Sequence, residues 1–330
     1  MKKISKLLFS IVAILMLAVI AACGNGDSKE ASKEKKESST ESQSYKVEHA
    51  MGTAEIPKKP ERVVVLTNEG TEALLAMGLK PVGAVQSWLG DPWYDHIKDE
   101  MKDVEVVGTE SEVNVEKIAA LQPDLIIGNK LRQEAIYDKL NQIAPTVFSE
   151  TLRGDWQENF KLYAKAIDRE EEGQKVLDDF NNHVEEVKQK LGDQVNQEVS
   201  VVRFMAGVTR IYWKDSFSGV IFDQIGFKRP AQQEKLFTSA NKLGDLAVEV
   251  GKEQIPEMDG DIIFYFTYAP QGDKEALQAE KEWTNDPLWK NLNAVKNGKA
   301  YKVDDAIWNT AGGVLAANHM LDDLEKLLTQ

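Results

Sequence analysis

Two stretches that lie far apart in the chain share one pattern, which is a short helix, a turn, an aspartate and an apolar strand. Lys117–Ile127 reads KIAALQPDLII and Gln254–Phe264 reads QIPEMDGDIIF. A strand that is apolar at consecutive positions is buried on both faces, which is typical of parallel sheets covered by helices. The repetition therefore predicts two lobes of similar build, each an α/β unit.

The segments around these stretches add further strands and helices. Short β-rich runs lie at 62–66, 81–85, 104–108 and 199–205, and helical patterns lie at 71–77, 115–121 and 218–225. Gly78 and Gly226 directly follow two of the helical patterns, and glycine at that place ends helices. Strands that alternate with short helices indicate mostly parallel sheets, so we predict two Rossmann-like α/β lobes.

A long helical stretch separates the two halves. Four bulky side chains fall on one face of a first helix there: Trp156, Phe160, Tyr163 and Ile167. A second helix is predicted from Asp168 to Leu191, and Glu171 predicts a capping box with Asp168 at its start. At 1.5 Å per residue the second helix is about 36 Å long, which is enough to cross from one lobe to the other as a rigid connector.

Residues 1–22 have the features of a lipoprotein signal peptide. A short basic start precedes Leu7–Ile20, which is apolar except for Ser10 and shorter than the about 20 residues of a membrane-spanning helix. The run ends in Ile20-Ala-Ala-Cys23, which resembles the bacterial lipobox, so Cys23 is expected to carry a lipid anchor. The alternatives are an ordinary signal peptide with a chance cysteine and a transmembrane anchor.

Residues 23–44 are predicted to form a flexible tether between the lipid and the folded part. Ala31 is the only apolar side chain from Gly24 to Ser44, so this segment buries too little surface to fold. Cys23 is the only cysteine, and no intrachain disulfide is possible. The predicted organisation is a signal peptide at 1–22, a tether at 23–44, an N-terminal lobe at 45–154, a helical connector at 155–194 and a C-terminal lobe at 195–330.

Charge and motifs argue against nucleic-acid binding and against catalysis. The formal net charge is −14, and no basic face of the kind that a nucleic-acid partner requires is indicated. No glycine-rich phosphate loop and no G-x-S-x-G nucleophile turn is present. The histidines, at positions 49, 96, 183 and 319, have no metal-ligand spacing. We therefore expect neither an enzyme nor a resident metal or cofactor.

Arginine and aromatic residues collect in loops and at predicted strand ends. The candidate ligand-binding residues are Trp88, Trp93, Tyr94, Arg132, Arg203, Arg210, Tyr212, Trp213, Tyr268, Trp308 and Asn309. Ligands of open α/β sheets bind outside the carboxyl ends of the strands, and two facing lobes would form a cleft there. Guanidinium groups suit anionic oxygen atoms and aromatic rings supply apolar contact, which is the chemistry expected of a ligand-binding cleft.

Structural roles are the alternative for several of these residues. Arg203 could belong to a structural ion pair, and the Trp88–Tyr94 loop could cover the edge of a lobe. Trp156 and Trp283 are expected to pack in the core or at an interface instead of meeting a ligand.

The lipobox and the tether occur together with three further segments, which are Arg62–Gly83, the Asp124 strand with Arg132 after it, and Ser216–Pro230. In this combination the chain resembles the iron(III)-siderophore-binding lipoproteins of Gram-positive ABC importers. Within that family it is similar to Bacillus receptors for citrate-hydroxamate siderophores of the schizokinen and arthrobactin type. Thr209–Tyr212 and Trp308–Gly313 also resemble segments of the staphyloferrin A receptor.

The resemblance implies a fold and a mechanism. The fold is that of class III periplasmic binding proteins, in which a helical backbone joins two lobes. A monomer that is lipid-anchored on the outer face of the cytoplasmic membrane binds ferric siderophore and delivers it to an ABC permease with its ATPase. Docking is expected through one acid on each lobe, Glu72 and Asp223, which would meet arginines of the permease.

The identity of the siderophore is a separate question. Phe204–Thr209, between Arg203 and Arg210, is uncharged, whereas the staphyloferrin type carries more basic groups, so a less charged ferric citrate-dihydroxamate is favoured. A neutral trihydroxamate is an alternative, and a bis-catecholate is disfavoured by its charge. Two further functions stay open at this point, a haem or cobalamin receptor of the same fold and a surface-anchored siderophore-processing enzyme.

Overall fold

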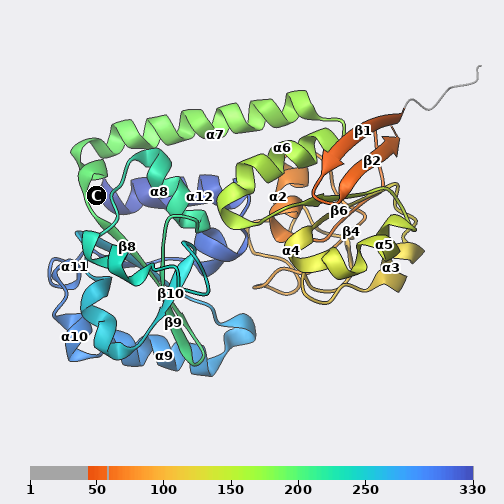
Figure 1. Cartoon of the computed structure of the whole chain (residues 1–330). Helices are drawn as coiled ribbons and strands as arrows, with labels where there is room; N and C mark the ends of the chain where they lie inside the picture. Colours follow the sequence, from red (N-terminus) through yellow and green to blue (C-terminus); the bar gives the residue numbers. More distant parts are fainter. Residues whose placement is uncertain (1–43, 58, 330) are drawn as a thin grey trace, which may run out of the picture. The chain divides into compact units, whose positions relative to one another are not determined.

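The structure is a computed structural model that describes residues 44–57 and 59–329 (Figure 1). The predicted signal peptide, Cys23 and all of the predicted tether except Ser44 lie outside the described residues. Within the described ranges, no helix is both long enough and apolar enough to cross a membrane.

The N-terminal half is built on a parallel five-stranded sheet in the order β5-β4-β3-β6-β7. Its strands are β3 (Val63–Val65), β4 (Gly83–Ala84), β5 (Glu105–Val106), β6 (Leu125–Asn129) and β7 (Thr146–Ser149). The first four occur where strands are predicted, whereas β7 is an additional strand. A hairpin of β1 (Ser44–His49) and β2 (Gly52–Pro57) precedes the sheet.

Short helices connect these strands: α2 (Asn68–Ala76), α3 (Val115–Ala120), α4 (Lys130–Gln133), η1 (Glu134–Ile136) and α5 (Tyr137–Asn141). Helix α2 begins before the predicted residue 71, because the side chain of Thr67 caps it and accepts a hydrogen bond from the Gly70 amide. The earlier start places Glu69 on α2 together with Glu72.

The C-terminal half contains a second five-stranded sheet in the order β10-β9-β8-β11-β12. Its strands are β8 (Val199–Met205), β9 (Val208–Tyr212), β10 (Ala247–Val250), β11 (Ile262–Thr267) and β12 (Ala300–Lys302). Strands β8, β11 and β12 pair in parallel, but β9 pairs antiparallel with both of its neighbours, β8 and β10. The expectation of a mostly parallel sheet is wrong at this edge, because a tight turn with Gly207 at φ 71° returns the chain as a hairpin.

Helix α8 (Phe217–Ile225) has defined ends. The Ser216 hydroxyl accepts a hydrogen bond from the Gly219 amide, and Gly226, at φ 102°, follows the last turn. The other helical segments of this half are η4 (Ala231–Leu236), η5 (Lys252–Met258), η6 (Pro270–Gly272), α9 (Lys274–Thr284), α10 (Pro287–Lys290), α11 (Asn293–Lys296), the π-helical turn η7 (Ala306–Thr310) and α12 (Val314–Leu328).

Two helices form the connector, which runs through η2 (Arg153–Asp155), α6 (Trp156–Ala166), α7 (Glu170–Leu191) and η3 (Gly192–Asn196). Helix α7 packs against α6 and, further along, against α8 and α12, so it contacts both halves (Figure 1). The predicted long helix is confirmed. The predicted capping box is wrong, because Asp168 has φ 55° and α7 begins after Arg169 without a side-chain cap.

The main apolar core runs through the connector and both sheets. It includes Val65 from β3, Phe180 from α7 and Phe264 from β11. Trp156 lies in this core with its ring centroid 5.1 Å from that of Phe180, and it has the packing role predicted for it. Because one core joins the two halves, separating them would expose apolar surface to water.

Candidate functional site

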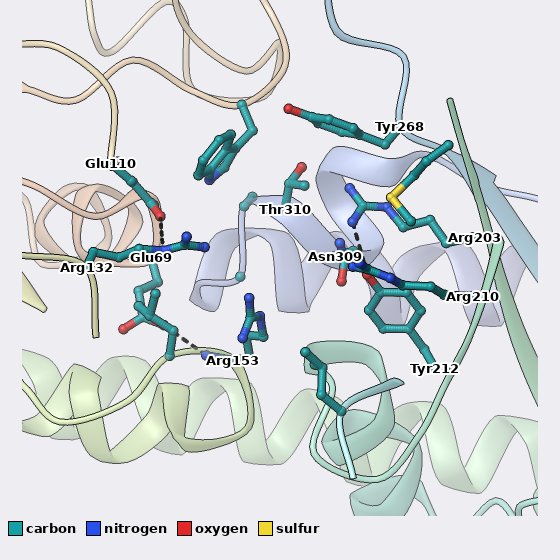
Figure 2. Close-up of a pocket in the computed structure, with 16 residues that line it drawn as sticks. Glu69, Glu110, Arg132, Arg153, Arg203, Arg210, Tyr212, Tyr268, Asn309 and Thr310 are labelled. Carbon is teal, nitrogen blue, oxygen red and sulfur yellow. Dashed lines mark hydrogen bonds and ion pairs between the residues drawn. The ribbon is translucent and has the colours of Figure 1, made fainter. Parts of the chain in front are cut away.

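A cleft of about 250 Å³ is lined by residues of both halves (Figure 2). The N-terminal half contributes Glu69, Trp88, Glu110, Leu152, Arg132 and Arg153. The C-terminal half contributes Arg203, Met205, Arg210, Tyr212, Leu246, Tyr268, Asn309, Thr310, Ala311 and Gly312. Arg132 closely follows β6 and Tyr268 directly follows β11, so the cleft lies at the carboxyl ends of central strands.

The structure brings seven of the predicted ligand-binding residues together in this lining: Trp88, Arg132, Arg203, Arg210, Tyr212, Tyr268 and Asn309. They come from β8 and β9, from helix α4, from the loops that follow β4 and β11, and from the π-helical turn η7. Figure 2 shows arginines that extend toward the same space from both sides of the cleft. Contact of these residues with a ligand stays a prediction.

Four predicted residues lie elsewhere, and we correct their assignment. Trp93 and Tyr94 are buried in the main core, with the Tyr94 ring stacked on His96. Trp213 is buried against Phe237, at a ring-centroid distance of 4.6 Å.

Trp308 is the fourth of these residues. Its ring is fully buried 4.6 Å from that of Phe264, and its Nε1 donates a hydrogen bond to Asp323 over 3.0 Å. Burial of this kind depends on tertiary packing, which the local sequence does not reveal. Next to it, Asn309 lines the cleft.

Arg132 lies between a carboxylate and an aromatic ring. Its Nε is 3.8 Å from Oε2 of Glu110, and its guanidinium lies 5.6 Å from the ring centroid of Trp88. The other oxygen of Glu110 accepts hydrogen bonds from the amide and the side chain of Asn68, over 2.7 and 2.8 Å. Glu110, which the sequence did not predict, therefore anchors Arg132 to the start of α2.

Arg203 forms the structural ion pair that was its alternative role. It is 7% exposed and donates two hydrogen bonds to Asp305, from Nε over 2.6 Å and from Nη2 over 3.0 Å. Its Nη1 donates to the Tyr212 hydroxyl over 3.0 Å, and its guanidinium lies 4.7 Å from the ring centroid of Tyr268. Burial alone lowers the pKa of Arg203, but Asp305 and Tyr212 outweigh it, so the pKa of Arg203 is raised.

Arg210 lies directly opposite Arg203 in the β8–β9 pairing. Its Nη2 donates to Oε1 of Glu249 over 2.8 Å, and Glu249 is largely exposed at the edge strand β10. Two arginines at one cross-strand pair repel each other, and each is compensated by its own carboxylate. The positive charges of both guanidinium groups in this part of the cleft are therefore balanced by carboxylates.

Arg153 is a cleft residue that the sequence did not predict. It lies in η2, after the unpredicted strand β7, and its backbone is left-handed at φ 74°. No carboxylate lies within ion-pair distance of its guanidinium among the described residues. Burial and then the charge of Arg132 lower the pKa of Arg153. A loop after a recognised β7 strand would have been the sequence signal for this residue.

Glu69 supports the floor of the cleft beside Arg153. It is 6% exposed, and its Oε1 accepts hydrogen bonds from Asn159 over 2.8 Å and from the Tyr163 hydroxyl over 3.0 Å. Its Oε2 lies 3.5 Å from the Arg153 amide nitrogen. Burial raises the pKa of Glu69 to about 8, although the hydrogen bonds from Tyr163 and Asn159 oppose the shift. The carboxyl is therefore mainly protonated at neutral pH.

The charges of the cleft nearly cancel. Arg132, Arg203 and Arg210 each face a carboxylate, Arg153 does not, and Glu69 is mainly neutral. One positive charge is left over when these groups are counted. An anionic ligand of low charge would complement it.

The two predicted docking acids differ in exposure. Glu72 is fully buried, with its Oε1 2.5 Å from Nε2 of His96 and its Oε2 accepting a hydrogen bond from the Ala316 amide over 2.9 Å. The assignment of Glu72 to docking is therefore wrong, because its carboxylate joins α2 to α12 instead of facing outward. Asp223 is exposed on α8.

Residues 63–307 match the family model for periplasmic binding proteins. The chain belongs to this family. The "Probable siderophore-binding lipoprotein YfiY" of Bacillus subtilis strain 168 is 54% identical over 326 residues, which cover 98% of each chain. The "Putative ABC transporter substrate-binding lipoprotein YhfQ" of the same strain is 32% identical, with 96% of each chain covered.

Solved structures agree with this membership of the periplasmic binding protein family. Staphylococcus aureus SirA in complex with staphyloferrin B is 36% identical and superposes with a TM-score of 0.78. The match covers 86% of this chain and 98% of SirA. The predicted fold class, two α/β lobes with a long helix between them, is confirmed. The chain is a binding protein and not an enzyme, as its missing catalytic motifs predicted.

Proposed function

We propose that this protein is the extracellular substrate-binding lipoprotein of an ABC importer, which captures a ferric siderophore in its cleft and delivers it to the permease. The observation that carries the proposal is the arginine-lined cleft between two lobes of this family. The names of the relatives, a probable siderophore-binding lipoprotein and a protein in complex with staphyloferrin B, support it.

The charge of the cleft favours a citrate-hydroxamate ligand of the schizokinen or arthrobactin type. Two hydroxamates and one α-hydroxycarboxylate around iron(III) leave a complex with a single negative charge. That charge complements the surplus of one guanidinium, that of Arg153. Ligands with several negative charges would require more unpaired cations than this cleft contains.

Iron(III) is cargo in this proposal, and the oxygen atoms of the siderophore hold it. The cleft supplies guanidinium groups to the outer oxygen atoms and the rings of Trp88, Tyr212 and Tyr268 to the apolar parts. Within the described ranges, no cluster of three or more His, Cys, Asp or Glu side chains could hold a metal ion. The alternative, a haem or cobalamin receptor of the same fold, would use the same rings for a flat macrocycle.

We also propose that the protein acts as a monomer, anchored through a lipid on Cys23 to the outer face of the cytoplasmic membrane. The names of two relatives include the word lipoprotein, which supports the anchor. Asp223 is the proposed docking acid of the C-terminal half, since it is exposed on α8.

Uptake of radioactive iron supplied as ferric schizokinen tests this function. A strain from which the gene has been deleted should lose most of its uptake, and the wild-type chain should restore it. Cys23→Ala should restore less, because the unlipidated chain leaves the membrane surface. Unchanged uptake in the deleted strain, with ferric schizokinen as the only iron source, would contradict the proposal.

A further inference from the structure

A second cavity of about 210 Å³ adjoins the arginine cleft. Trp88, Glu110 and Tyr268 line both cavities, so the two are neighbouring parts of one space. We call the second cavity the outer compartment. Like the cleft, it takes its walls from both halves, with Thr109 from the N-terminal half and Pro270 from the C-terminal half.

The outer compartment differs from the cleft in its charge. Four arginines line the cleft, whereas no lysine, arginine or histidine among the described residues lines the outer compartment. Its one charged residue within the described ranges is Glu110, and that carboxylate already accepts hydrogen bonds from Asn68 and lies near Arg132. An anionic group in the outer compartment would meet the Glu110 carboxylate and no cation of the compartment's own described lining, so the compartment disfavours further negative charge.

Aromatic rings stand where the two cavities meet. The Trp88 ring has the guanidinium of Arg132 over it, and the Tyr268 ring has that of Arg203 over it. Both rings also line the outer compartment. A ligand group that extends from the arginines into the outer compartment therefore passes between two aromatic side chains, one from each half of the chain.

The loop that carries Trp88 is held by its own hydrogen bonds. The Ser87 amide donates to the Pro92 carbonyl oxygen, and the Ser87 hydroxyl accepts from the Tyr94 amide, each over 3.0 Å. Gly90 has φ 97°, and a Cβ there would lie 2.0 Å from the carbonyl oxygen of Trp93, so this turn requires glycine. The wall of the outer compartment is thus preformed, which lowers the entropic cost of binding.

We infer that the outer compartment is a subsite for an uncharged acyl arm of the ligand, whose anionic iron centre is held by the arginines. This inference rests on the proposed function and narrows its substrate class to hydroxamate siderophores whose acyl groups are long enough to reach past the two aromatic rings into the outer compartment. Such arms carry no charge and bring methylene groups to aromatic faces. Each methylene that is removed from water should tighten binding by up to about fourfold.

Calorimetry with two ligands of equal charge tests the subsite. One is ferric schizokinen, whose arms end in acetyl groups, and the other is a synthetic analogue with octanoyl groups at the same positions. We expect the full-length protein to bind the octanoyl analogue at least about tenfold more tightly. Equal or weaker binding of the analogue by the wild-type protein would overturn the inference while the proposed function stands.

Variants locate the effect. Gln86 and Gln271 line the outer compartment from opposite halves without lining the cleft, so Gln86→Trp and Gln271→Trp should each reduce the affinity ratio toward one. Gln224→Trp, at an exposed position of α8, is the matched control and should keep the ratio. An unchanged ratio in both test variants would place the arm outside this compartment and overturn the inference. Failure of both ligands to bind the wild-type protein would instead refute the proposed function.

Discussion

Arg153 differs from the other arginines of the cleft because no carboxylate lies within ion-pair distance of it among the described residues. We predict that Arg153→Gln weakens ferric schizokinen binding by about tenfold to a hundredfold, because a charged hydrogen-bond donor is lost. Arg153→Lys should recover part of the loss, since it keeps the charge without the planar fork. Calorimetric titration measures both, and wild-type affinity in Arg153→Gln would contradict the assignment.

Glu69 should make stability depend on pH. Its pKa is raised from 4.5 to about 8 in the folded state, so its contribution to stability is present below about pH 4.5 and is lost as the pH rises to about 8. We predict that Glu69→Gln, which cannot ionise, gains more than about 1 kcal/mol of stability relative to wild type between about pH 5 and pH 8.5.

Urea unfolding at the two pH values measures this gain. Glu112→Gln is the matched control, and it should show a smaller change because Glu112 is exposed. A difference between Glu69→Gln and wild type that is the same at both pH values would show that Glu69 is ionised at neutral pH.

The sequence predicts cleft residues well where they follow a recognisable strand. Arg132 and Tyr268 come after the apolar strands β6 and β11, and both line the cleft. Trp93 and Trp308 lie in predicted loops, as Trp88 does, yet both are buried by packing between distant segments. Arg153 was missed because β7, the strand before it, was not recognised as one.

At the scale of elements, Glu72 joins helix α2 to helix α12. Its carboxylate accepts a hydrogen bond from the Ala316 amide and contacts His96. Glu72→Ala would leave the buried Ala316 amide without a partner and would remove the contact of the partly buried His96, so we predict a loss of about 1–3 kcal/mol in the free energy of unfolding.

Denaturant midpoints measure this loss. Asp223→Ala, which changes an exposed acid, is the control and should stay within about 0.5 kcal/mol of wild type. Equal stability of Glu72→Ala and wild type would contradict the inter-helix role.

Element types were predictable where local signals agree with packing. Helix α8 has a serine at its start and Gly226 after its end, and both signals are visible in the sequence. The pattern of Asp168 and Glu171 predicted a capping box that the structure does not contain. The chain turns between α6 and α7, α7 begins after Arg169, and the Arg169 side chain donates a hydrogen bond to the Met77 carbonyl oxygen. The β8–β9 hairpin was missed because its turn is very short, with Gly207 only two residues after the last residue of β8.

At the scale of the molecule, the repeated helix–aspartate–strand pattern predicted two α/β halves, and the helical pattern from Asp168 to Leu191 predicted the long helix between them. The cleft itself depends on how loops of the two halves meet, which no local pattern encodes. That is why three of its four arginines were predictable from strand ends, whereas Arg153 and the carboxylate partners Glu110 and Asp305 were not.

Tryptophan fluorescence during titration reports binding in the cleft directly, because Trp88 lies there with Arg132 over its ring. The purified protein is titrated with ferric schizokinen, with neutral ferrioxamine and with the more anionic ferric citrate. We expect tight, saturable quenching by ferric schizokinen and weaker responses to the other two. Saturable binding of haem or cobalamin with no response to ferric schizokinen would show that the cleft is not a siderophore site.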